Sequence, residues 1–321
     1  MRRFFLLVLS ACSLDESGLG TPADGGSDAV VKDATILDVA TNDAPSDVIV
    51  DAAPDVPQPP CNPTAAFGNL NAVAGVVNTS AYESTPFLTK DELGIFFARD
   101  TGGGKIALFY ASRGATNQPF GNDAELSSIS SNQSIDTSPW VNDNLSSMLF
   151  ASERNGDKHY HLYKATGNGQ SDGWTNITEL TTLDWVEPAA DLHPWVVPAT
   201  GEVWFASDRL GSLDIYYAAS TTTTPAWYAP LATNAAESHP VLTADALTIF
   251  FERTDSQNKG HIFAATRAST ASLFGNVTQL MEFDSGQSQS APGWISADGC
   301  RMYFSTDRSG AFDIWMATRG S

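Results

Sequence analysis

Hydrophobic and polar residues alternate through residues 290–319 in a pattern that is typical of antiparallel β-strands. Three short alternating runs cover 292–296, 301–306 and 313–318. They are separated by an Ala-Asp-Gly segment at 297–299 and by an Asp-Arg-Ser-Gly segment at 307–310. Gly, Asp and Ser favour tight turns. The stretch therefore predicts three β-strands joined by two turns.

The same pattern occurs four more times upstream, so it is a repeat. Each copy contains a proline in its first strand, and successive prolines lie 53, 55, 46 and 52 residues apart: Pro86, Pro139, Pro194, Pro240 and Pro292. Aromatic residues recur in the second and third strands of each copy, where they can fill the space between neighbouring sheets. Repeats of about 40–50 residues with several strands each predict a β-propeller.

A fourth strand is predicted between copies from segments that start with Phe or Trp and end in Leu, at 120–126, 174–180, 227–231 and 274–280. A fifth such segment, at 67–70, precedes the first copy, and none follows the last copy. We therefore expect the strand at Phe67 to complete the last blade and to leave no free sheet edge. The predicted fold is an all-β, five-bladed propeller of four-stranded blades, with six blades as the alternative.

Two cysteines flank this predicted closure. Cys61 lies just before the closing strand, and Cys300 lies in the first turn of the blade that this strand completes. Both places lie on the same rim of an up-and-down blade, so a Cys61–Cys300 disulfide would latch the ring if the protein is exported. Two unpaired thiols are the alternative.

Residues 1–12 have the features of an export signal. Arg2 and Arg3 precede an apolar run at 4–9 that is too short to span a bilayer. The Leu-Ser-Ala-Cys sequence at 9–12 resembles the lipobox of bacterial lipoproteins, which implies that Cys12 is lipidated. Ser13 replaces the Asp that retains such lipoproteins in the inner membrane. The expected location is therefore the outer membrane, facing the periplasm or the cell surface; an ordinary signal peptide is the alternative.

The charge of the chain limits the partners that it can have. The formal net charge is −20 at pH 7, and residues 61–321 hold 27 acidic against 14 basic residues. Nucleic acid and anionic membrane surfaces are therefore excluded as partners, because binding them needs clustered cations. Residues 13–60 are rich in Asp, Ala and Pro and contain no aromatic residue. We expect them to form a disordered acidic tether before a propeller domain at 61–321.

Three motifs recur in the repeats: Pro-x-x-(Ser/Thr)-x-Asp-Gly, aromatic-Phe-x-Ser-(Asp/Glu)-Arg-x-Gly and Asp-Ile-(Tyr/Trp). With these motifs the units resemble the WD40-like repeats of TolB-type β-propellers, most clearly at 290–319 and 191–220. The resemblance covers residues 67–321 and implies a propeller that can be a scaffold, a binding domain or an appendage of a peptidase. TolB has six blades and a preceding α/β domain, so its role in the envelope is not carried over to this chain.

An acidic residue lies three positions before the proline in four copies, as Glu83, Asp136, Asp191 and Glu237, and Gln289 takes this place in the fifth. The innermost strands begin here, so we expect the four acids to surround one mouth of the central channel, with His193 and His239 nearby. Such a ring can bind Ca²⁺ or a cationic ligand. Alternatively, each side chain caps the turn before its own strand. Arginines in the loops after the second strands are expected to pair with acids of the same hairpins.

The chain contains no recognisable catalytic motif. The Gly-Gly-Gly-Lys sequence at 102–105 lacks the other residues of a phosphate-binding loop, and neither His-Glu-x-x-His nor Gly-x-Ser-x-Gly occurs. The five histidines have no metal-ligand spacing. No cofactor is therefore predicted, with Ca²⁺ as the one candidate.

These observations predict a non-enzymatic, lipid-anchored propeller of the bacterial cell envelope. It would bind an envelope protein, a peptide or a glycan, contact the membrane through its lipid anchor alone, and be a monomer. A glycan-active hydrolase is the first alternative, because five-bladed furanosidases place paired carboxylates in a central pocket. Near-identical positions in every repeat argue against it, since catalytic acids need different environments. A Ca²⁺-stabilised structural propeller is the second alternative.

Overall fold

The computed structural model describes residues 61–130, 134–167, 172–185 and 189–320. The chain divides into two units, residues 1–56 and 57–321, and the description below concerns the second unit. The predicted lipidation of Cys12 and the predicted tether at 13–60 lie outside the described residues. In the part of the chain that is described, no helix has the length and apolar character needed to cross a membrane.

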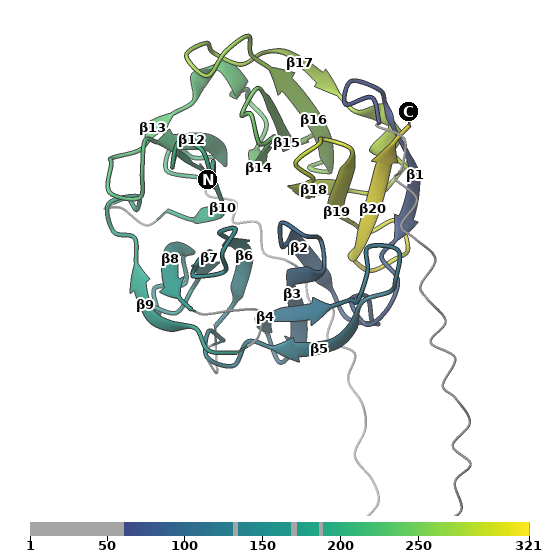
Figure 1. Cartoon of the computed structure of the whole chain (residues 1–321). Coiled ribbons are helices and arrows are strands. Elements are labelled where there is room, and N and C mark those ends of the chain that lie inside the picture. Colours follow the sequence, from purple (N-terminus) through teal and green to yellow (C-terminus); the bar gives the residue numbers. More distant parts are fainter. Residues whose placement is uncertain (1–60, 131–133, 168–171, 186–188, 321) are drawn as a thin grey trace, which may run out of the picture. The chain divides into compact units, whose positions relative to one another are not determined.

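Five four-stranded antiparallel sheets are arranged as the blades of a propeller (Figure 1). Blade one contains β2 (Glu83–Leu88), β3 (Gly94–Gly102), β4 (Lys105–Ser112) and β5 (Gly121–Glu125). Blade two contains β6 (Asp136–Val141), β7 (Ser147–Ser152), β8 (His161–Thr166) and β9 (Thr175–Glu179). Blade three contains β10 (Asp191–Val196), β11 (Val203–Ser207), β12 (Asp214–Ala218) and β13 (Ala226–Trp227).

Blade four contains β14 (Glu237–Leu242), β15 (Thr248–Thr254), β16 (Gly260–Thr266) and β17 (Gly275–Gln279). Blade five contains β18 (Ser290–Ile295), β19 (Arg301–Thr306), β20 (Asp313–Arg319) and β1 (Phe67–Ala72). Two short 3₁₀ helices, η1 (Ala229–Leu231) and η2 (Met281–Phe283), lie between blades. The five blades confirm the predicted fold and exclude the six-bladed alternative.

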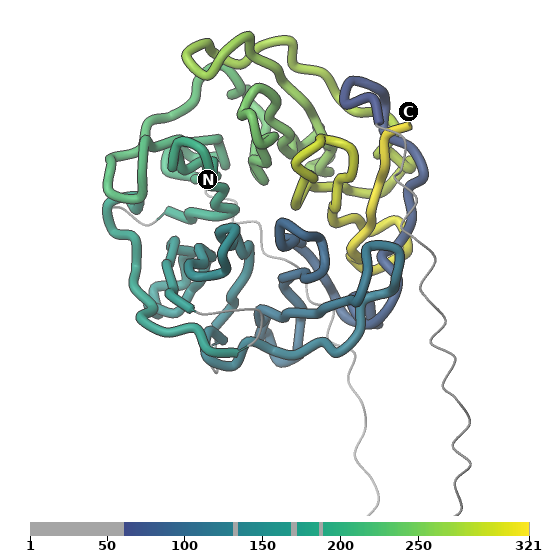
Figure 2. The backbone as a smooth tube through the Cα atoms, viewed as in Figure 1, coloured from purple at the N-terminus to yellow at the C-terminus, as the bar shows by residue number. Residues whose placement is uncertain are grey.

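The ring closes through the pairing of β1 with β20. Phe67 lies opposite Arg319, and Ala72 lies opposite Trp315. Figure 2 follows the chain around the ring and shows the N-terminal strand, in purple, beside the yellow C-terminal strand. The first described strand thus supplies the outer strand of the last blade, as the sequence predicted.

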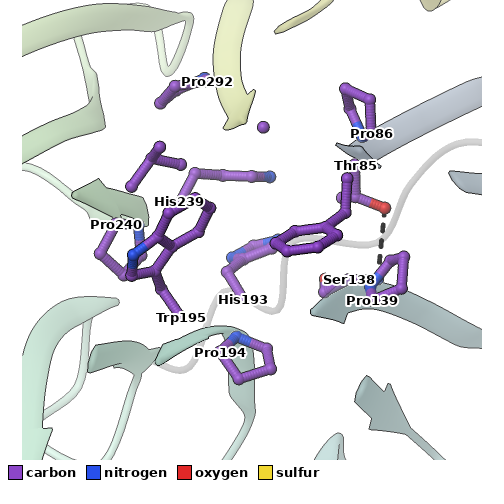
Figure 3. Close-up of a pocket in the computed structure, with 13 residues that line it drawn as sticks. Thr85, Pro86, Ser138, Pro139, His193, Pro194, Trp195, His239, Pro240 and Pro292 are labelled. Carbon is purple, nitrogen blue, oxygen red and sulfur yellow. Dashed lines mark hydrogen bonds between the residues drawn. The ribbon is translucent and has the colours of Figure 1, made fainter. Parts of the chain in front are cut away.

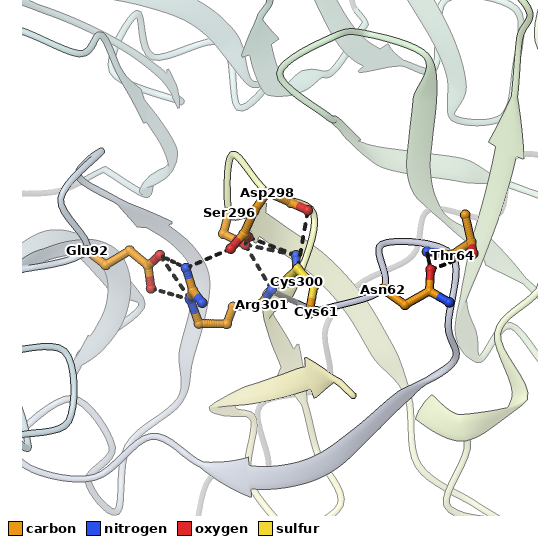
Figure 4. Close-up of a disulfide and its surroundings, with 8 residues drawn as sticks. All are labelled: Cys61, Asn62, Thr64, Glu92, Ser296, Asp298, Cys300 and Arg301. Atoms are coloured by element: carbon orange, nitrogen blue, oxygen red, sulfur yellow. Dashed lines mark hydrogen bonds and ion pairs between the residues drawn. A yellow bond between two sulfur atoms is a disulfide. The ribbon is translucent and has the colours of Figure 1, made fainter. Parts of the chain in front are cut away.

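Cys61 and Cys300 form a disulfide at this closure, with their Cα atoms 6.1 Å apart (Figure 4). The amide of Asn62 donates to the carbonyl of Gly320 at 2.9 Å, so the backbone also joins the two ends of the ring. Arg301 binds Glu92 of blade one through its Nε and Nη2 atoms at 2.8 and 2.6 Å. A covalent bond and a backbone hydrogen bond therefore fix the N-terminal segment to blade five, and an ion pair joins blade five to blade one.

Aromatic side chains from the second strands fill the space between the blades. In each second strand except that of blade two, two neighbouring aromatic residues are buried, and in blade two Leu149 and Phe150 take these places. The first residue of each predicted fourth segment is also buried in blades one, two, four and five. Phe96 meets Trp174 of the next blade edge-on at 6.3 Å. These contacts explain why aromatic residues recur in step with the repeat.

Blade three departs from the predicted length of the fourth strand. The sequence predicted a strand at 227–231, but β13 ends at Trp227 and η1 follows at once. Pro230 has no amide hydrogen and a fixed φ angle, so it cannot continue the ladder and instead suits the 3₁₀ turn. The outer edge of this blade is therefore short.

Candidate functional site

The four acids that the sequence singled out are buried and paired with arginine. Glu83, Asp136 and Glu237 are 0% exposed, and Asp191 is 1% exposed. Their ion pairs are Glu83–Arg99 at 2.9 Å, Asp136–Arg154 at 2.7 Å, Asp191–Arg209 at 2.6 Å and Glu237–Arg253 at 2.8 Å. The sequence placed the acids at the channel mouth and paired the arginines with other acids of their hairpins. In the structure the two groups pair with each other.

Each of these arginines also binds the segment that precedes its own blade. The Nη2 atom donates to a backbone carbonyl, which belongs to Val76, Ile129, Leu183 and Leu231 in blades one to four and to Phe283 in blade five. The guanidinium group lies 4.6–5.4 Å from two aromatic rings, one on the second strand and one on the third. We call this arrangement of arginine, first-strand residue and carbonyl the arginine latch.

The strand register corrects the alignment of the fifth blade. Ser290 lies opposite Thr306 in blade five, as Asp136 lies opposite Ser152 in blade two. Ser290, and not Gln289, is therefore the equivalent of the acids. Gly293 then takes the position that proline has in the other four blades. The alignment of the fifth repeat on Pro292 was therefore one residue out of register. A Cβ atom on Gly293 would lie 2.6 Å from Pro86, so the close contact between blades five and one requires glycine.

The latch makes the acids unsuitable as a catalytic or cation-binding ring. Burial raises the pKa of Glu237 even though Arg253 and Thr233 bind its carboxylate. Burial likewise raises the pKa of Asp191, against the opposing effect of Arg209. The turn-cap alternative holds for Glu83 and Glu237, which accept hydrogen bonds from the backbone amides of Thr79 and Thr233 at 3.1 and 3.3 Å. Each acid also balances a partly buried arginine within its own blade.

The central channel is lined by prolines and by two histidines, as Figure 3 shows. His193 and His239 stack with ring centroids 3.4 Å apart. The cavity here has a volume of about 30 Å³. That space holds about one water molecule, whereas pockets for small ligands measure roughly 300–1,000 Å³. This cavity is therefore too small to hold a sugar ring.

The two stacked histidines have different surroundings. Burial, followed by the proximity of His239, lowers the pKa of His193 well below its usual value. The Nδ1 atom of His193 has no hydrogen-bond partner among the described residues. His239 donates from Nδ1 to Glu252 at 2.9 Å. Although burial acts to raise it, the hydrogen bonds from His239 and Ser238 hold the pKa of Glu252 below its usual value.

A second polar cluster, in blade two, was missed in the sequence. His161, Glu179 and Asp184 each place one possible ligand atom within 4.8 Å of the other two. They lie at the start of β8, at the end of β9 and in the segment after β9. Because they are separated by 18 and 5 residues, no local spacing marks them as a metal site. A comparison of blade two with blade four could have found them, because histidine and aspartate occupy equivalent positions in both blades and only the third residue differs.

Blade three carries exposed apolar side chains around its latch. Trp185 is 49% exposed, Leu210 is 62% exposed and Trp227 is 46% exposed. The guanidinium of Arg209 lies 5.5 Å from the Trp185 ring and 4.6 Å from the Tyr216 ring. Leu210 follows Arg209 in the chain, and Trp227 lies opposite Tyr216 in the pairing of β12 with β13. We call Trp185, Leu210 and Trp227 the blade-three patch.

No protein-family model and no curated protein matches the chain. Solved structures match it in fold. TolB from Acinetobacter baumannii is 15% identical, with a TM-score of 0.47 over 76% of this chain and 57% of that protein. A putative TolB from Agrobacterium tumefaciens is 13% identical, with a TM-score of 0.48 over 78% of each chain.

The catalytic domain of a GH62 α-L-arabinofuranosidase from Coprinopsis cinerea is also similar. It is 11% identical, with a TM-score of 0.51 over 80% of this chain and 98% of that domain. The chain spans little more than half the length of the Acinetobacter TolB. At 11% identity the similarity to this domain concerns the fold alone.

Proposed function

We propose that the propeller is a non-catalytic binding module of the bacterial envelope that holds a basic segment of a protein partner. In this proposal Cys12 carries the lipid anchor, and the acidic tether at 13–60 separates the propeller from the outer membrane. The observation that supports a binding role most strongly is the arginine latch. It occupies all four of the acids that could have formed a catalytic pair.

The shape of the channel supports the same conclusion. A hydrolase that acts on glycans needs two carboxylates on either side of a bound sugar. The latch acids are buried against arginine, and the channel cavity of about 30 Å³ leaves no room for a sugar. A macromolecular partner would therefore dock on the surface of the propeller and not inside this cavity.

The blade-three patch is the surface that we assign to this partner. Tryptophan is enriched among the residues that dominate protein interfaces, and here both tryptophans are about half exposed. Residues 61–321 carry 13 more acids than basic residues, so the domain as a whole attracts a cationic partner. Lysine and arginine side chains of the partner can also stack on the exposed indole rings.

The test is a binding measurement with immobilised synthetic peptides of defined charge and, in parallel, an array of glycans. We expect basic peptides to bind and their affinity to fall by at least about tenfold in a Trp185→Ala, Trp227→Ala double variant. A Leu273→Ala, Met281→Ala variant is the control, since both residues are exposed apolar side chains on blade four. It should bind as the unaltered chain does.

Three results would contradict the proposal. Acidic peptides could bind as tightly as basic ones, the patch variant could retain full affinity, or glycans could bind when no peptide does. The hydrolase alternative is tested separately by assaying polysaccharide hydrolysis with an Asp191→Asn, Glu237→Gln variant. If hydrolysis is measurable and this variant abolishes it, the propeller is an enzyme.

A further inference from the structure

The cluster in blade two combines an imidazole with two carboxylates in an arrangement that no hydrogen bond closes. The Nδ1 atom of His161 lies 3.6 Å from Asp184 Oδ2 and 3.8 Å from Glu179 Oε1. Both distances exceed those of a hydrogen bond. His161 is 9% exposed, so solvent has little access to the atom that faces the two acids.

The other ring nitrogen of His161 determines what Nδ1 can do. Nε2 lies 2.9 Å from Asp157 Oδ2, at hydrogen-bond distance, and this contact requires a proton on Nε2. In the neutral ring the lone pair of Nδ1 then points at two carboxylates. Lone pair and carboxylates repel one another unless a metal ion lies between them or Nδ1 takes up a proton. A carboxylate on the far nitrogen is also the usual support of a metal-binding histidine.

Asp184 has the most unusual environment of the three residues. Its side chain is 8% exposed, and neither of its carboxylate oxygens has a hydrogen-bond partner among the described residues. A buried carboxylate that accepts no hydrogen bond is costly, because it has lost its hydration. Among the described residues the ion-pair partner of Asp184 is His161, at 3.6 Å, beyond hydrogen-bond distance.

Blade four provides an internal comparison for this site. His261 is the equivalent of His161, Asp284 follows β17 as Asp184 follows β9, and Gln279 takes the place of Glu179. There His261 Nδ1 donates to Asp284 at 2.8 Å, and the Gln279 amide donates to the same carboxylate at 2.8 Å. Blade four is thus closed by hydrogen bonds, whereas blade two has a glutamate that cannot donate.

We propose that His161 Nδ1, Glu179 Oε1 and Asp184 Oδ2 bind a divalent transition metal ion, with Zn²⁺ as the best fit to the donors. Tetrahedral ligands with bonds of about 2.1 Å lie about 3.4 Å apart, close to the observed 3.6 and 3.8 Å. Three protein ligands leave one position open for water or another ligand. Tyr163, which donates to Glu179 Oε2 at 3.0 Å, orients the second ligand.

The donor set distinguishes Zn²⁺ from the Ca²⁺ that the sequence suggested. Ca²⁺ takes six to eight oxygen ligands, whereas imidazole nitrogen suits Zn²⁺ and neighbouring transition metals. The site also lies on blade two, away from the channel where the Ca²⁺ ring was expected. Because Asp184 directly precedes Trp185, a bound ion would fix the segment that leads to this exposed ring.

The test is isothermal titration of the full chain, freed of any affinity tag and of metal, with ZnCl₂. We expect about one tight equivalent per chain. Glu179→Gln, which reproduces the residue found in blade four, should weaken this binding by at least about 100-fold, since losing a ligand costs more than losing a supporting residue. Asp184→Asn should do the same without changing the size of the side chain. Circular dichroism verifies that both variants fold.

Glu125→Gln is the matched control. Glu125 occupies the position of Glu179 in blade one, where it pairs with Lys105 at 2.7 Å. It should leave zinc binding unchanged, although it removes the same charge. The proposal is overturned if no equivalent of Zn²⁺ binds, if Glu179→Gln binds as tightly as the unaltered chain, or if CaCl₂ occupies the site and ZnCl₂ does not.

Discussion

The arginine latch makes a quantitative prediction because one blade lacks the acid. Arg253 of blade four binds Glu237, a side chain that is 0% exposed. Arg308 of blade five has the same carbonyl and ring contacts but faces Ser290 and Thr306 in place of an acid. Replacing each arginine with methionine, which retains most of the apolar stem, therefore separates the ion pair from the rest of the latch.

We expect Arg253→Met to lower the free energy of unfolding by about 3–5 kcal/mol, because it leaves the Glu237 carboxylate buried without a countercharge. Arg308→Met should cost about 1–2 kcal/mol, for the lost hydrogen bond to the Phe283 carbonyl. Burial lowers the pKa of Arg308, so its charged form is already disfavoured in the folded state. The expected difference between the two variants is about 2 kcal/mol or more.

The assay is urea denaturation followed by tryptophan fluorescence at pH 8 and pH 5. In Arg253→Met the pKa of Glu237, already raised above 4.5 by burial, should rise further. A folded-state pKa above the unfolded value means that stability is lost as pH rises, so the deficit should be larger at pH 8 than at pH 5. Equal costs for the two variants, or a deficit that does not depend on pH, would refute the role assigned to the ion pair.

Three further changes test the closure, the channel and the contact between blades. Cys300→Ser opens a loop of 239 residues and should lower the free energy of unfolding by about 5 kcal/mol in the chain-entropy model, as measured by urea denaturation. As pH falls below 6.5, the free energy of unfolding of the parent should drop by up to about 1.4 kcal/mol per pH unit relative to that of His193→Ser. The reason is that His193 takes up a proton in the unfolded chain but stays neutral in the folded one. Gly293→Ala should cost about 1–3 kcal/mol through its clash with Pro86, whereas Gly275→Ala, which meets nothing within 4 Å, should not.

Each of these expectations has a clear contrary result. A reductant that leaves the unfolding midpoint unchanged would refute the role of the disulfide in stability. A stability difference for His193→Ser that is the same at pH 5 and pH 8 would show that His193 is not held neutral. Equal effects of the two glycine substitutions would show that the blades can separate at Gly293 without cost.

The fold was predictable because its signals are local and repeated. Each strand is a short alternating run between turn residues, and the missing fourth strand of the last copy points to the segment at Phe67. The same approach failed where one residue shifts the register. Pro292 matches the other prolines by type, but the strand pairing places Gly293 in their position and Ser290 in the position of the acids. A proline is a less reliable marker than the pairing of the strand that contains it.

The candidate sites were harder to predict, because burial and partnership are not visible in a sequence. The sequence around Glu237 does not show whether its carboxylate lines a channel or pairs with Arg253, which it does at 2.8 Å. The cluster of His161, Glu179 and Asp184 comes from two strands and the segment after them. The sequence places them in one blade, but the distances between their atoms depend on how the β8–β9 pair and that segment pack.

The comparison of blades two and four indicates where this repeat protein carries chemistry. The latch arginine recurs in all five blades with the same kind of contacts, as expected of a residue that maintains the fold. The histidine and the following aspartate recur in blades two and four, but the third residue is Glu179 in one and Gln279 in the other. The distance from histidine to aspartate is 3.6 Å beside the glutamate and 2.8 Å beside the glutamine. The strand pairing is the same in both blades, so the exchange of glutamine for glutamate accompanies the wider spacing. The zinc site that we propose therefore lies where blade two departs from the hydrogen-bonded arrangement of blade four.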